Sequence, residues 1–477
     1  MVIAAVMASM AMVAIEATIV STVMPQIAST LGGLHLYSWV FASFLLAQTA
    51  MTVVFGKLSD IYGRKPVMFI GIAIFLAGSL LAGLAWSMPA MIVFRLIQGI
   101  GAGAIQPVSL TIVGDLYPVQ ERGKVQGYLA SVWAVSAVVG PLLGALIVQQ
   151  LSWAWIFWIN IPIGLLAALG FHLFLREAPI RRQTSVDILG AVLFALGIAA
   201  LMVALTEFGI GNIGAAFAWT ALFAVTTLLF VAQERRVADP MISGRLWGAR
   251  IIATVNGAAL LSGMALIGIT TFLPMFVQVV LQRSSVVAGL ALTMVMLGWP
   301  LGATLASRTF LRVGLWRLVI AGALLVPVGA TAFALLSPVS SPAQAAVGSF
   351  VMGLGFGLLS LSSLILIQEA TELSQRGSAT ASNVFSRNLG SALGAAFFGA
   401  VFNFGLTRGG SATVTDEQLR QLLEGTSTST ADAAMRLAIG GALHLSFAAM
   451  LAIGLGVLAL SLTLPRHGLG RRLGAIS

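Results

Sequence analysis

Two ionisable residues stand inside long apolar stretches of this 477-residue chain, where charged side chains are costly. Glu16 is the only acidic residue in the middle of such a stretch, and Arg95 lies within another. An ionisable group in such surroundings is by default a hypothesis for a functional site. Because burial disfavours the charged form of a carboxyl group, Glu16 is suited to take up and release a proton.

The spacing of the chain also allows these two residues to meet. Glu16 precedes Met24, the expected outer end of its stretch, by eight residues, and Arg95 follows Met88 by seven. At 1.5 Å of helix per residue, both lie about 10–12 Å below the outer surface. An ion pair is therefore possible, and a proton, cation or substrate could act by breaking it. A purely structural pair is the alternative, and Arg95 fits a role in helix packing as well as one in coupling.

A short polar loop follows the second apolar stretch. Gly56, Asp60, Gly63 and Arg64 lie in the segment GKLSDIYGRK. The glycines permit a tight turn and close helix approach, and Asp60 can form an ion-pair latch with the basic residues. An ordinary basic loop would explain Lys and Arg, but it would not explain Gly, Asp and Gly at these spacings. We therefore expect a latch between helices.

Part of the chain repeats itself. Glycines, acids and an Arg-Gly pair recur at a constant separation of 254 positions (353 minus 99). The first copy consists of Gly99, Gly101, Gly103, Asp115, Arg122, Gly123 and Gly140, and the second of Gly353, Gly355, Gly357, Glu369, Arg376, Gly377 and Gly394. Two similar halves in one membrane chain are typical of secondary transporters, whose sites lie between the repeats.

The repeated charges lie at equivalent helix ends. Asp115 and Arg122 belong to the first copy, and Glu369 and Arg376 belong to the second. We expect these four residues to pair with the polar loop after the second apolar stretch and with its counterpart in the second half, and so to stabilise an outward-facing state. Ordinary solvated loop charge is the alternative.

Composition places the chain in a membrane. It is 59% hydrophobic and 8% charged, whereas a soluble domain carries about 25% charged residues. A span needs about 20 apolar residues in a helix. We expect fourteen spans, near 2–24, 37–56, 66–86, 89–113, 123–149, 153–175, 187–206, 216–233, 251–280, 286–306, 315–337, 343–367, 378–406 and 437–463.

Basic residues predict the orientation. Most of the 25 Lys and Arg residues fall in alternate loops, with Arg376 and Arg387 assigned to one of them. Because Lys and Arg concentrate in cytoplasmic loops, both termini are predicted to be cytoplasmic. The net charge of +10 therefore reflects topology and does not indicate a nucleic-acid partner.

The spans divide into two bundles of six. Residues 1–176 form the first bundle and residues 251–465 the second, while the two spans within 187–233 have no counterpart under the repeat. Residues 234–250 form a cytoplasmic connector, and the polar stretch 407–436 forms an extracellular loop with a short surface helix. The expected fold class is an all-α polytopic membrane protein.

The fifth span contains three residues that shape a helix. Gly140 and Gly144 let backbones approach closely, and Pro141 removes a helical hydrogen bond. They could seal the bundle against proton leakage and act as a pivot. Ordinary packing of small residues is the alternative.

Polar and aromatic residues within the spans could line a substrate site. The candidates are Gln48, Gln106, Trp133, Asn160, Asn256, Phe272, Gln278, Phe385 and Asn388. No cluster of His or Cys suggests a metal, no P-loop suggests ATP hydrolysis, and no nucleophile with a base suggests an enzyme.

Together these patterns resemble the major facilitator superfamily. The segment GKLSDIYGRK resembles its signature loop, RLIQGIGAG its fourth-span motif, GPLLGA its fifth-span antiporter motif and EATIV its first-span acidic motif. With two extra central spans, the resemblance is to the fourteen-span drug:proton antiporter branch, and it covers the whole chain. Two positions depart from that branch: the first-span acid is Glu rather than Asp, and the antiporter motif ends in Gly-Ala.

The resemblance implies two pseudo-symmetric six-helix bundles that export apolar, often cationic compounds. A proton gradient would drive export without a cofactor, and Glu16 would hold either a proton or a cation. The implied partners are the lipid bilayer, protons and hydrophobic or cationic small molecules, with the protein acting as a monomer in the bacterial cytoplasmic (inner) membrane.

Other functions remain open at this point. The same fold could export a lipid or a metabolite, or could import a substrate together with protons. A membrane sensor or scaffold would need a larger soluble domain, and a channel would need charges lining one span.

Overall fold

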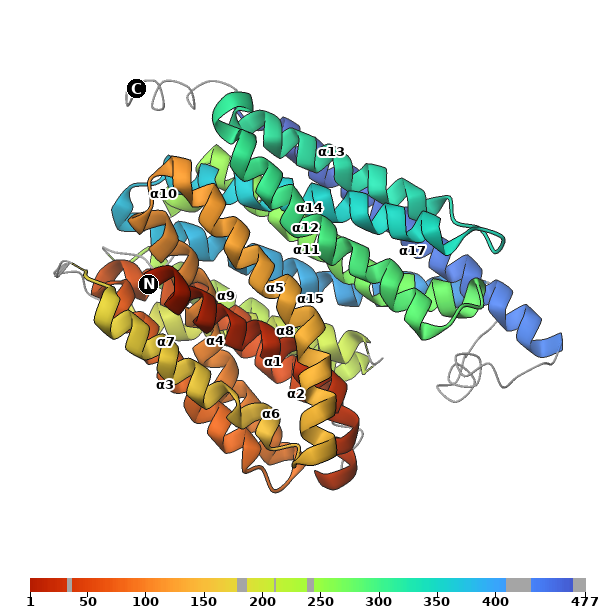
Figure 1. Ribbon diagram of the computed structural model, residues 1–477, viewed down its shortest axis with the longest axis horizontal. Coiled ribbons are helices and arrows are strands. Elements are labelled where there is room, and N and C mark those ends of the chain that lie inside the picture. Colours follow the sequence, from red (N-terminus) through yellow and green to blue (C-terminus); the bar gives the residue numbers. More distant parts are fainter. Residues whose placement is uncertain (32–36, 178–186, 210–211, 238–243, 409–429, 466–477) are drawn as a thin grey trace. The chain divides into compact units, whose positions relative to one another are not determined.

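The computed structural model describes residues 1–31, 37–177, 187–209, 212–237, 244–408 and 430–465 (Figure 1). Within these residues every regular element is a helix. Thirteen described helical segments are long and apolar enough to cross a membrane. The remaining expected span, 123–149, lies within a further helix, α5 (Val119–Gln150). The predicted all-α polytopic fold is confirmed.

The described part of the first half of the chain forms ten helices. They are α1 (Val2–Leu31), α2 (Tyr37–Tyr62), α3 (Arg64–Gly83), α4 (Met88–Leu116), α5, α6 (Trp155–Trp158), α7 (Asn160–Phe174), α8 (Ile188–Gly209), α9 (Ile213–Glu234) and α10 (Gly244–Trp247).

The second half follows the same helical pattern. Its elements are α11 (Arg250–Met275) with the π-helix Phe276–Val280, α12 (Ser285–Val313), α13 (Leu315–Ala334), α14 (Pro342–Ala370), the 3₁₀ turn Leu373–Gln375, α15 (Arg376–Arg408) and α17 (Thr430–Leu462).

Several helices begin where the sequence supplies a capping side chain. Ser87 accepts a hydrogen bond from the backbone N–H of Ala90 at the start of α4 (3.4 Å), and Asn212 does the same for α9. Such side chains satisfy N–H groups that have no partner in the first helical turn. Local sequence therefore sets these helix starts.

Other helix ends differ from the expected spans. α1 continues to Leu31, beyond the apolar run that ends near residue 24, and α17 begins at Thr430, inside the expected loop 407–436. Backbone hydrogen bonds continue a helix past the end of its apolar stretch, so hydropathy alone does not find its last residue. The surface helix expected in that loop lies largely outside the described residues.

The chain packs as two compact units. The first unit contains Met1–Ile252 together with Leu364–Phe385, and the second contains Ala253–Ser363 together with Ser386–Ser477. The end of α14 and the start of α15 therefore pack with the first half of the chain. These units are defined by packing, whereas the predicted bundles 1–176 and 251–465 are defined by the sequence repeat. The predicted bundle boundaries therefore stay a prediction.

In the first unit, the glycine triplet of α4 lets two neighbouring helices approach the α4 backbone. A Cβ atom at Gly99 would overlap the backbone of Phe44 in α2, and one at Gly101 would overlap the backbone of Phe75 in α3. Gly103 returns to α2, where a Cβ atom would lie 2.9 Å from the carbonyl oxygen of Gln48.

The second unit repeats this alternation in α14. A Cβ atom at Gly353 would overlap Val295 of α12, and one at Gly355 would lie 2.9 Å from the carbonyl oxygen of Gly322 in α13. Gly357 returns to α12, at Trp299. The repeat predicted from the sequence is therefore also a repeat of helix packing.

A single glycine joins equivalent helices in each unit. Gly63 lies between α2 and α3 with φ of 94°, and Gly314 lies between α12 and α13 with φ of 90°. These left-handed conformations are costly for any residue with a Cβ atom. Glycine allows one helix to end and the next to start within one residue.

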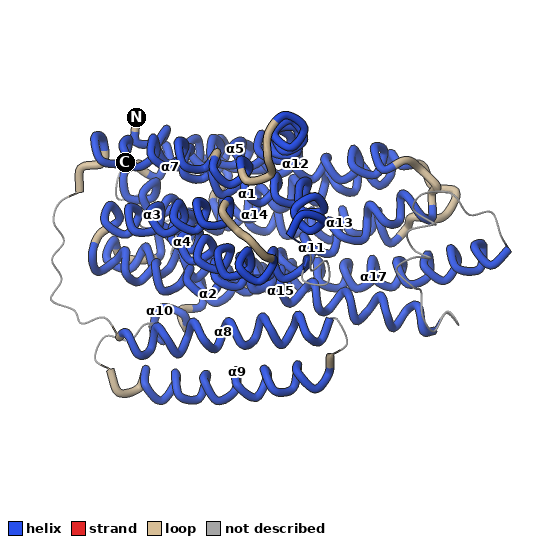
Figure 2. The backbone as a smooth tube through the Cα atoms, turned by 90° about the horizontal axis from the view of Figure 1, so that it is seen from below, coloured by secondary structure: helices blue, strands red, loops and turns tan. Residues whose placement is uncertain are grey.

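The two helices without a counterpart, α8 and α9, run side by side (Figure 2). Asp187 connects their ends, because its Oδ1 accepts hydrogen bonds from the backbone N–H of Gly190 (2.8 Å) and from Nε2 of Gln233 (3.0 Å). α8 also packs against α2. The helix pair is thus attached to the first unit.

Candidate functional site

Glu16 of α1 and Arg95 of α4 form an ion pair in the interior of the first unit. Arg95 Nη1 lies 2.5 Å from Glu16 Oε1, and the side chains are 2% and 0% exposed. The sequence predicts that these residues can meet, and the structure confirms that they do. Their role in coupling is not tested by this contact.

Further polar side chains complete the pairing of the Glu16 carboxylate. Asn160, the first residue of α7, donates from Nδ2 to Glu16 Oε2 (2.5 Å) and to Ser79 Oγ (3.0 Å). Gln98 accepts from Arg95 Nη1 (2.6 Å) and donates to the same Ser79 Oγ (3.1 Å). Four helices, α1, α3, α4 and α7, therefore contribute to one buried polar cluster.

Arg95 is held from its other sides as well. Its guanidinium lies 4.3 Å from the ring centre of Phe44, and its Nε donates to the carbonyl oxygen of Val40 (3.4 Å). An aromatic face attracts a cation through its quadrupole. The guanidinium is thus positioned by α2 in addition to its ion pair.

In this ion pair, the charge state of Glu16 determines whether the charge of Arg95 is compensated, and the reverse also holds. Removing one member of a buried pair leaves the other as an uncompensated buried charge. Protonation of Glu16 would have that effect on Arg95, so a proton arriving here could loosen the contact between α1 and α4. Asn160 Oδ1 is a buried atom without a hydrogen-bond partner, and it could accept from a protonated Glu16 if the amide turned.

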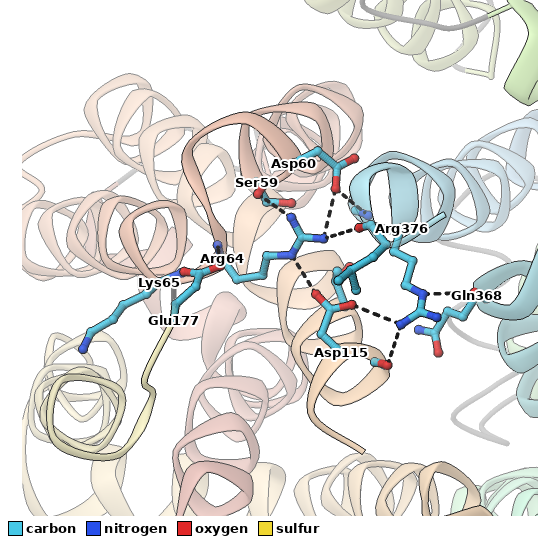
Figure 3. A network of polar contacts seen from close by, with 12 residues as sticks. Ser59, Asp60, Arg64, Lys65, Asp115, Glu177, Gln368 and Arg376 are labelled. Atoms are coloured by element: carbon cyan, nitrogen blue, oxygen red, sulfur yellow. Dashed lines mark hydrogen bonds and ion pairs between the residues drawn. The ribbon is translucent and has the colours of Figure 1, made fainter. Parts of the chain in front are cut away.

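A second polar network surrounds Arg64 at the start of α3 (Figure 3). Arg64 Nε donates to Asp115 Oδ2 at 2.9 Å, and its Nη2 lies 3.2 Å from Asp60 Oδ1. Arg64 also donates to the carbonyl oxygens of Ser59 (2.7 Å) and Leu373 (3.1 Å). One guanidinium therefore joins the ends of α2 and α4 to the turn before α15.

Asp60 binds the N-terminus of α15. Its carboxylate accepts hydrogen bonds from the backbone N–H of Gly377 (2.9 Å) and from the N–H and Oγ of Ser378 (2.8 and 2.7 Å). Unpaired N–H groups and the helix dipole both favour an anion at this end. The expected latch between helices is present as a contact, with a backbone cap that the sequence did not indicate.

Glycines make this cap possible. A Cβ atom at Gly377 would lie 2.6 Å from Asp60 Oδ1, and one at Gly56 would overlap the Cβ of Ala381. Each of these positions lies where α2 and α15 are in close contact. Larger residues would separate the two helices and remove the cap.

The repeated charges pair across the repeat. Arg122 Nη1 lies 2.6 Å from Glu369 Oε1, and Arg376 Nη1 lies 3.5 Å from Asp115 Oδ1. Of these four residues, Asp115 also contacts the signature loop of the first half in the described structure, through Arg64. The expected pairing with the signature loops is thus met by Asp115, and for the other three residues it stays a prediction. The helix ends that carry them adjoin within the first unit, so each arginine meets the acid of the other copy.

Sequence reasoning missed one residue of this network. Glu177 accepts from the backbone N–H of Arg64 (2.7 Å) and of Lys65 (2.9 Å), and so caps α3. A Cβ atom at Gly63 would lie 2.9 Å from its Oε2. A lone acid in a charged loop gives no signal of such a role.

Comparison with known proteins identifies the family. Residues 6–395 match the sequence model of the Major Facilitator Superfamily. The chain belongs to the major facilitator superfamily. It is therefore a multi-pass membrane transporter and not an enzyme.

Its relatives within the superfamily include drug pumps. Multidrug resistance protein 3 of Bacillus subtilis (strain 168) is 36% identical over 400 residues, which cover 82% of this chain and 77% of that protein. The multidrug transporter protein MdtP of the same organism is 31% identical over 401 residues, which cover 82% of this chain and 73% of that protein. These similarities support the interpretation that this chain is a multidrug efflux transporter of the superfamily.

Solved structures show the same major facilitator fold. The human organic anion transporter MFSD10 (TETRAN) aligns with a TM-score of 0.68 at 16% identity, covering 96% of this chain and 98% of that one. The proton:xylose symporter XylE aligns with a TM-score of 0.60 at 14% identity, covering 97% and 94%. At such identities the likeness concerns the fold alone.

The antiporter motif of this major facilitator protein lies against the helix that carries Glu16. A Cβ atom at Gly140 would overlap Oγ1 of Thr18, and one at Gly144 would lie 3.0 Å from Cγ1 of Ile19. Thr18 Oγ1 donates to the carbonyl oxygen of Ser136 in α5 (3.0 Å). Pro141 lies within α5, and the sealing and pivot roles of the motif stay predictions.

Three of the proposed cavity residues have specific partners. Asn160 belongs to the Glu16 cluster described above. Phe272 packs against Phe398 and Phe402 in the core of the second unit. Phe385 packs against Phe194 of α8 and against Trp247 of α10. These two rings are packing residues in the described arrangement.

The remaining cavity candidates lie on several helices. Buried or half-buried positions are occupied by Gln48 on α2, Gln106 on α4, Trp133 on α5, Asn256 on α11, Gln278 in the π-helix and Asn388 on α15. Gln278 Nε2 donates to the carbonyl oxygen of Pro274 (3.4 Å). Whether these residues line a substrate path stays a prediction.

Proposed function

We propose that this transporter exports lipophilic, often cationic compounds in exchange for protons. Glu16 is the coupling carboxylate in this proposal, and Arg95 is its internal counter-ion. The observation that carries it is the fully buried ion pair, with a 2.5 Å contact between the two side chains. Ionisable groups inside a membrane protein mark proton and substrate pathways by default.

The proposed cycle depends on competition for one carboxylate. A proton from outside neutralises Glu16 and releases Arg95, and a cationic compound from the cytoplasm takes the place of the proton. One carboxylate can hold either a proton or a cation at a given time. The proton gradient then supplies the free energy for export, and no cofactor is required.

The latch provides a reason for discrete conformations. Asp60 accepts three hydrogen bonds at the start of α15, and the crossed pairs involve Asp115 and Glu369. We infer that these contacts hold the cytoplasmic ends of helices together in an outward-facing state. Breaking them accompanies rocking of one repeat against the other, as in other transporters of repeated architecture. The protein works as a monomer in the bacterial cytoplasmic membrane in this proposal.

Proton flux in liposomes tests the proposal. Purified protein is reconstituted with an imposed inside-acid gradient and a trapped pH dye, and ethidium is added outside. Exchange of ethidium for internal protons raises the internal pH in wild type. The matched variant Glu16→Gln keeps the size of the side chain and removes the titrating group, and it is expected to abolish this signal.

Each outcome separates the alternatives. Equal flux in wild type and Glu16→Gln would move the proton site elsewhere, with His444 and Glu207 as the next residues to change. No flux with ethidium or with quaternary ammonium compounds would contradict drug export and would favour a lipid or metabolite cargo. Substrate uptake accompanied by proton entry would indicate a symporter.

A further inference from the structure

A second arginine lies inside a membrane span, and its surroundings differ from those of Arg95. Arg387 follows Arg376, the first residue of α15, by eleven positions. At 1.5 Å per residue it lies about 16 Å along the helix from that end. Its assignment to a cytoplasmic loop from the sequence is therefore wrong. Arg387 is an intramembrane residue.

Arg387 has no partner in the described part of the chain. Among those residues its side chain forms no hydrogen bond, ion pair or ring contact, and no carboxylate there acts on its charge. Arg95, by contrast, has a carboxylate, an amide oxygen, a carbonyl oxygen and an aromatic ring as partners. The two intramembrane arginines thus represent a satisfied cation and an unsatisfied one.

The second unit contains no counter-ion for Arg387 in its spans. Residues 253–363, 386–408 and 437–465 include no Asp or Glu. An isolated charge is costly in the interior of a membrane protein and persists when it is paired or reached by water. A neutralising anion for this unit therefore has to come from outside its spans.

The Arg387 side chain is not fully enclosed. It is half-buried, like that of the following residue, Asn388. Among the described residues, unpartnered side-chain atoms that are fully enclosed occur elsewhere in the protein, at Asn160 for example, but not at these two positions. Asn388 forms no side-chain hydrogen bond to any described residue either. A guanidinium and an amide without partners among the described residues are thus adjacent on one helix, and neither is fully enclosed.

The backbone beneath them is fixed. A Cβ atom at Gly263 of α11 would overlap the carbonyl oxygen of Arg387, so the two helices touch at this point. Ser391 Oγ lies 3.2 Å from the Arg387 carbonyl oxygen and 3.3 Å from that of Gly263. The unpaired side chain therefore extends from a closely packed helix crossing.

We propose that Arg387 is a binding subsite for a single anionic group, such as a sulfonate, carboxylate or phosphate, carried by a lipophilic molecule. The planar guanidinium suits such oxygen anions because it can donate two parallel hydrogen bonds. This inference extends the proposed export function, because it adds lipophilic anions and zwitterions to the cationic compounds that Glu16 would accept. The molecule can be a transported compound or a lipid with an anionic headgroup.

Equilibrium binding tests the subsite without requiring transport. Radiolabelled 2-naphthalenesulfonate and 2-naphthyltrimethylammonium have the same aromatic body and opposite charge. Each is measured by scintillation proximity on protein in phosphatidylcholine nanodiscs, with empty nanodiscs subtracted. Arg387→Gln is expected to weaken sulfonate binding about tenfold or more, as expected for one hydrogen bond to a charged group. Binding of the ammonium compound should be unchanged or tighter.

Two further variants keep the result interpretable. Arg387→Lys retains the charge and should keep part of the sulfonate binding, because only the fork geometry is lost. Arg312→Gln removes an exposed arginine at the end of α12 in the same unit and should leave both compounds unaffected. Retained ammonium binding by Arg387→Gln shows that the variant is folded. If that variant is unfolded, the Arg387→Lys measurement decides instead. Sulfonate binding by Arg387→Lys that is as tight as that of wild type and of Arg312→Gln would then overturn the subsite.

The lipid composition distinguishes the two sources of the anionic group. If a lipid headgroup occupies the subsite, phosphatidylglycerol in the nanodiscs competes with the sulfonate in wild type but not in Arg387→Gln. If transported compounds occupy it, phosphatidylglycerol has little effect. Equal sulfonate binding by wild type and Arg387→Gln in phosphatidylcholine nanodiscs contradicts the proposal. Failure of proton-coupled ethidium exchange would contradict the export function and would leave this binding result standing.

Discussion

At the position where the first repeat carries Arg95, the second carries Ser349, 254 positions later (349 minus 95). Arg95 is bound to a buried carboxylate, whereas Ser349 is buried and donates only to the carbonyl oxygen of Ala345 in its own helix (2.9 Å). The glycine triplets nevertheless pack in the same way in both units. The two halves therefore share a packing scheme, while the paired buried charges are concentrated in one of them.

This comparison separates what a repeat must conserve from what it can change. Helix crossings depend on small residues at fixed positions, so both copies need them. One buried ion pair is enough to respond to a proton, so only one of the two copies needs it. The second unit contains Arg387 instead, which has no partner among the described residues and which we propose as a subsite for ligands of opposite charge.

The largest expected effect comes from breaking the buried pair. Arg95→Met leaves Glu16 as an unpaired buried carboxylate, which should lower the free energy of unfolding by about 3–5 kcal/mol at neutral pH. Ser349→Ala should cost about 1 kcal/mol or less, because it removes one neutral hydrogen bond. Chemical unfolding in detergent compares the two variants.

Two controls test whether the stability lost in Arg95→Met is due to the unpaired charge of Glu16. The loss in Arg95→Met should shrink as the pH falls, because a protonated Glu16 carries no charge. The double variant Glu16→Gln/Arg95→Met should regain stability and still lack substrate-dependent proton flux. Similar losses for Arg95→Met and Ser349→Ala would contradict the contrast between the units.

A smaller effect is expected at the cap of α15. Asp60→Asn removes the charge that accepts hydrogen bonds from Gly377 and Ser378, at a cost of about 1.5–3 kcal/mol. Hydrogen exchange at those two amides should become faster. Asp187→Asn is the control, since Asp187 accepts from the backbone N–H of Gly190 in α8 and bonds to neither amide in the described structure, and it should leave their exchange slow.

The shared packing can be tested by matched glycine substitutions. Gly99→Ala and Gly353→Ala should each cost about 1–3 kcal/mol, because each new methyl group meets the backbone of a neighbouring helix. Gly399→Ala is the control, since a Cβ atom there has no described neighbour within 4 Å. Thermal unfolding should show similar losses for the first two variants and none for the third. A large difference between the first two would mean that the units do not share this packing.

The smallest effect is expected for the Arg122–Glu369 pair. The Glu369 side chain is 25% exposed, and pairs of this kind contribute about 1 kcal/mol or less. A double-mutant cycle with Arg122→Gln and Glu369→Gln measures this coupling, which should weaken with added salt. The exchanged pair Arg122→Glu/Glu369→Arg should restore part of it. A coupling of several kcal/mol would show that the pair is a principal contact of the latch.

The helices and their order could be predicted because each span needs an uninterrupted apolar run. The meeting of Glu16 and Arg95 could be predicted because both lie at one depth and charges in apolar surroundings require partners. The part that Ser79 has in this buried cluster could not be predicted, because the hydroxyl of a serine in a helix usually bonds to its own backbone. A single sequence shows such a hydroxyl without showing the neighbouring helix that it faces.

The latch could be predicted only in part. Glycine and aspartate spacing indicates a contact at Asp60, but the sequence does not show that the acceptors meet backbone N–H groups at Gly377. Equivalent charges indicate helix ends on one side of the membrane, and they leave the choice of partners open. Arg387 was assigned to a loop together with Arg376 although the expected span 378–406 contains it, and the structure places it inside α15.

The carboxylate of Asp60 has a consequence for leakage. Its three hydrogen bonds all go to two consecutive residues of one helix start, so a small displacement of that start lengthens all of them together. We therefore expect intermediate positions to retain little of this bonding. In the proposed transport cycle, such a cap would be either fully bound or released, which would shorten the time that a partly opened end is exposed to ions.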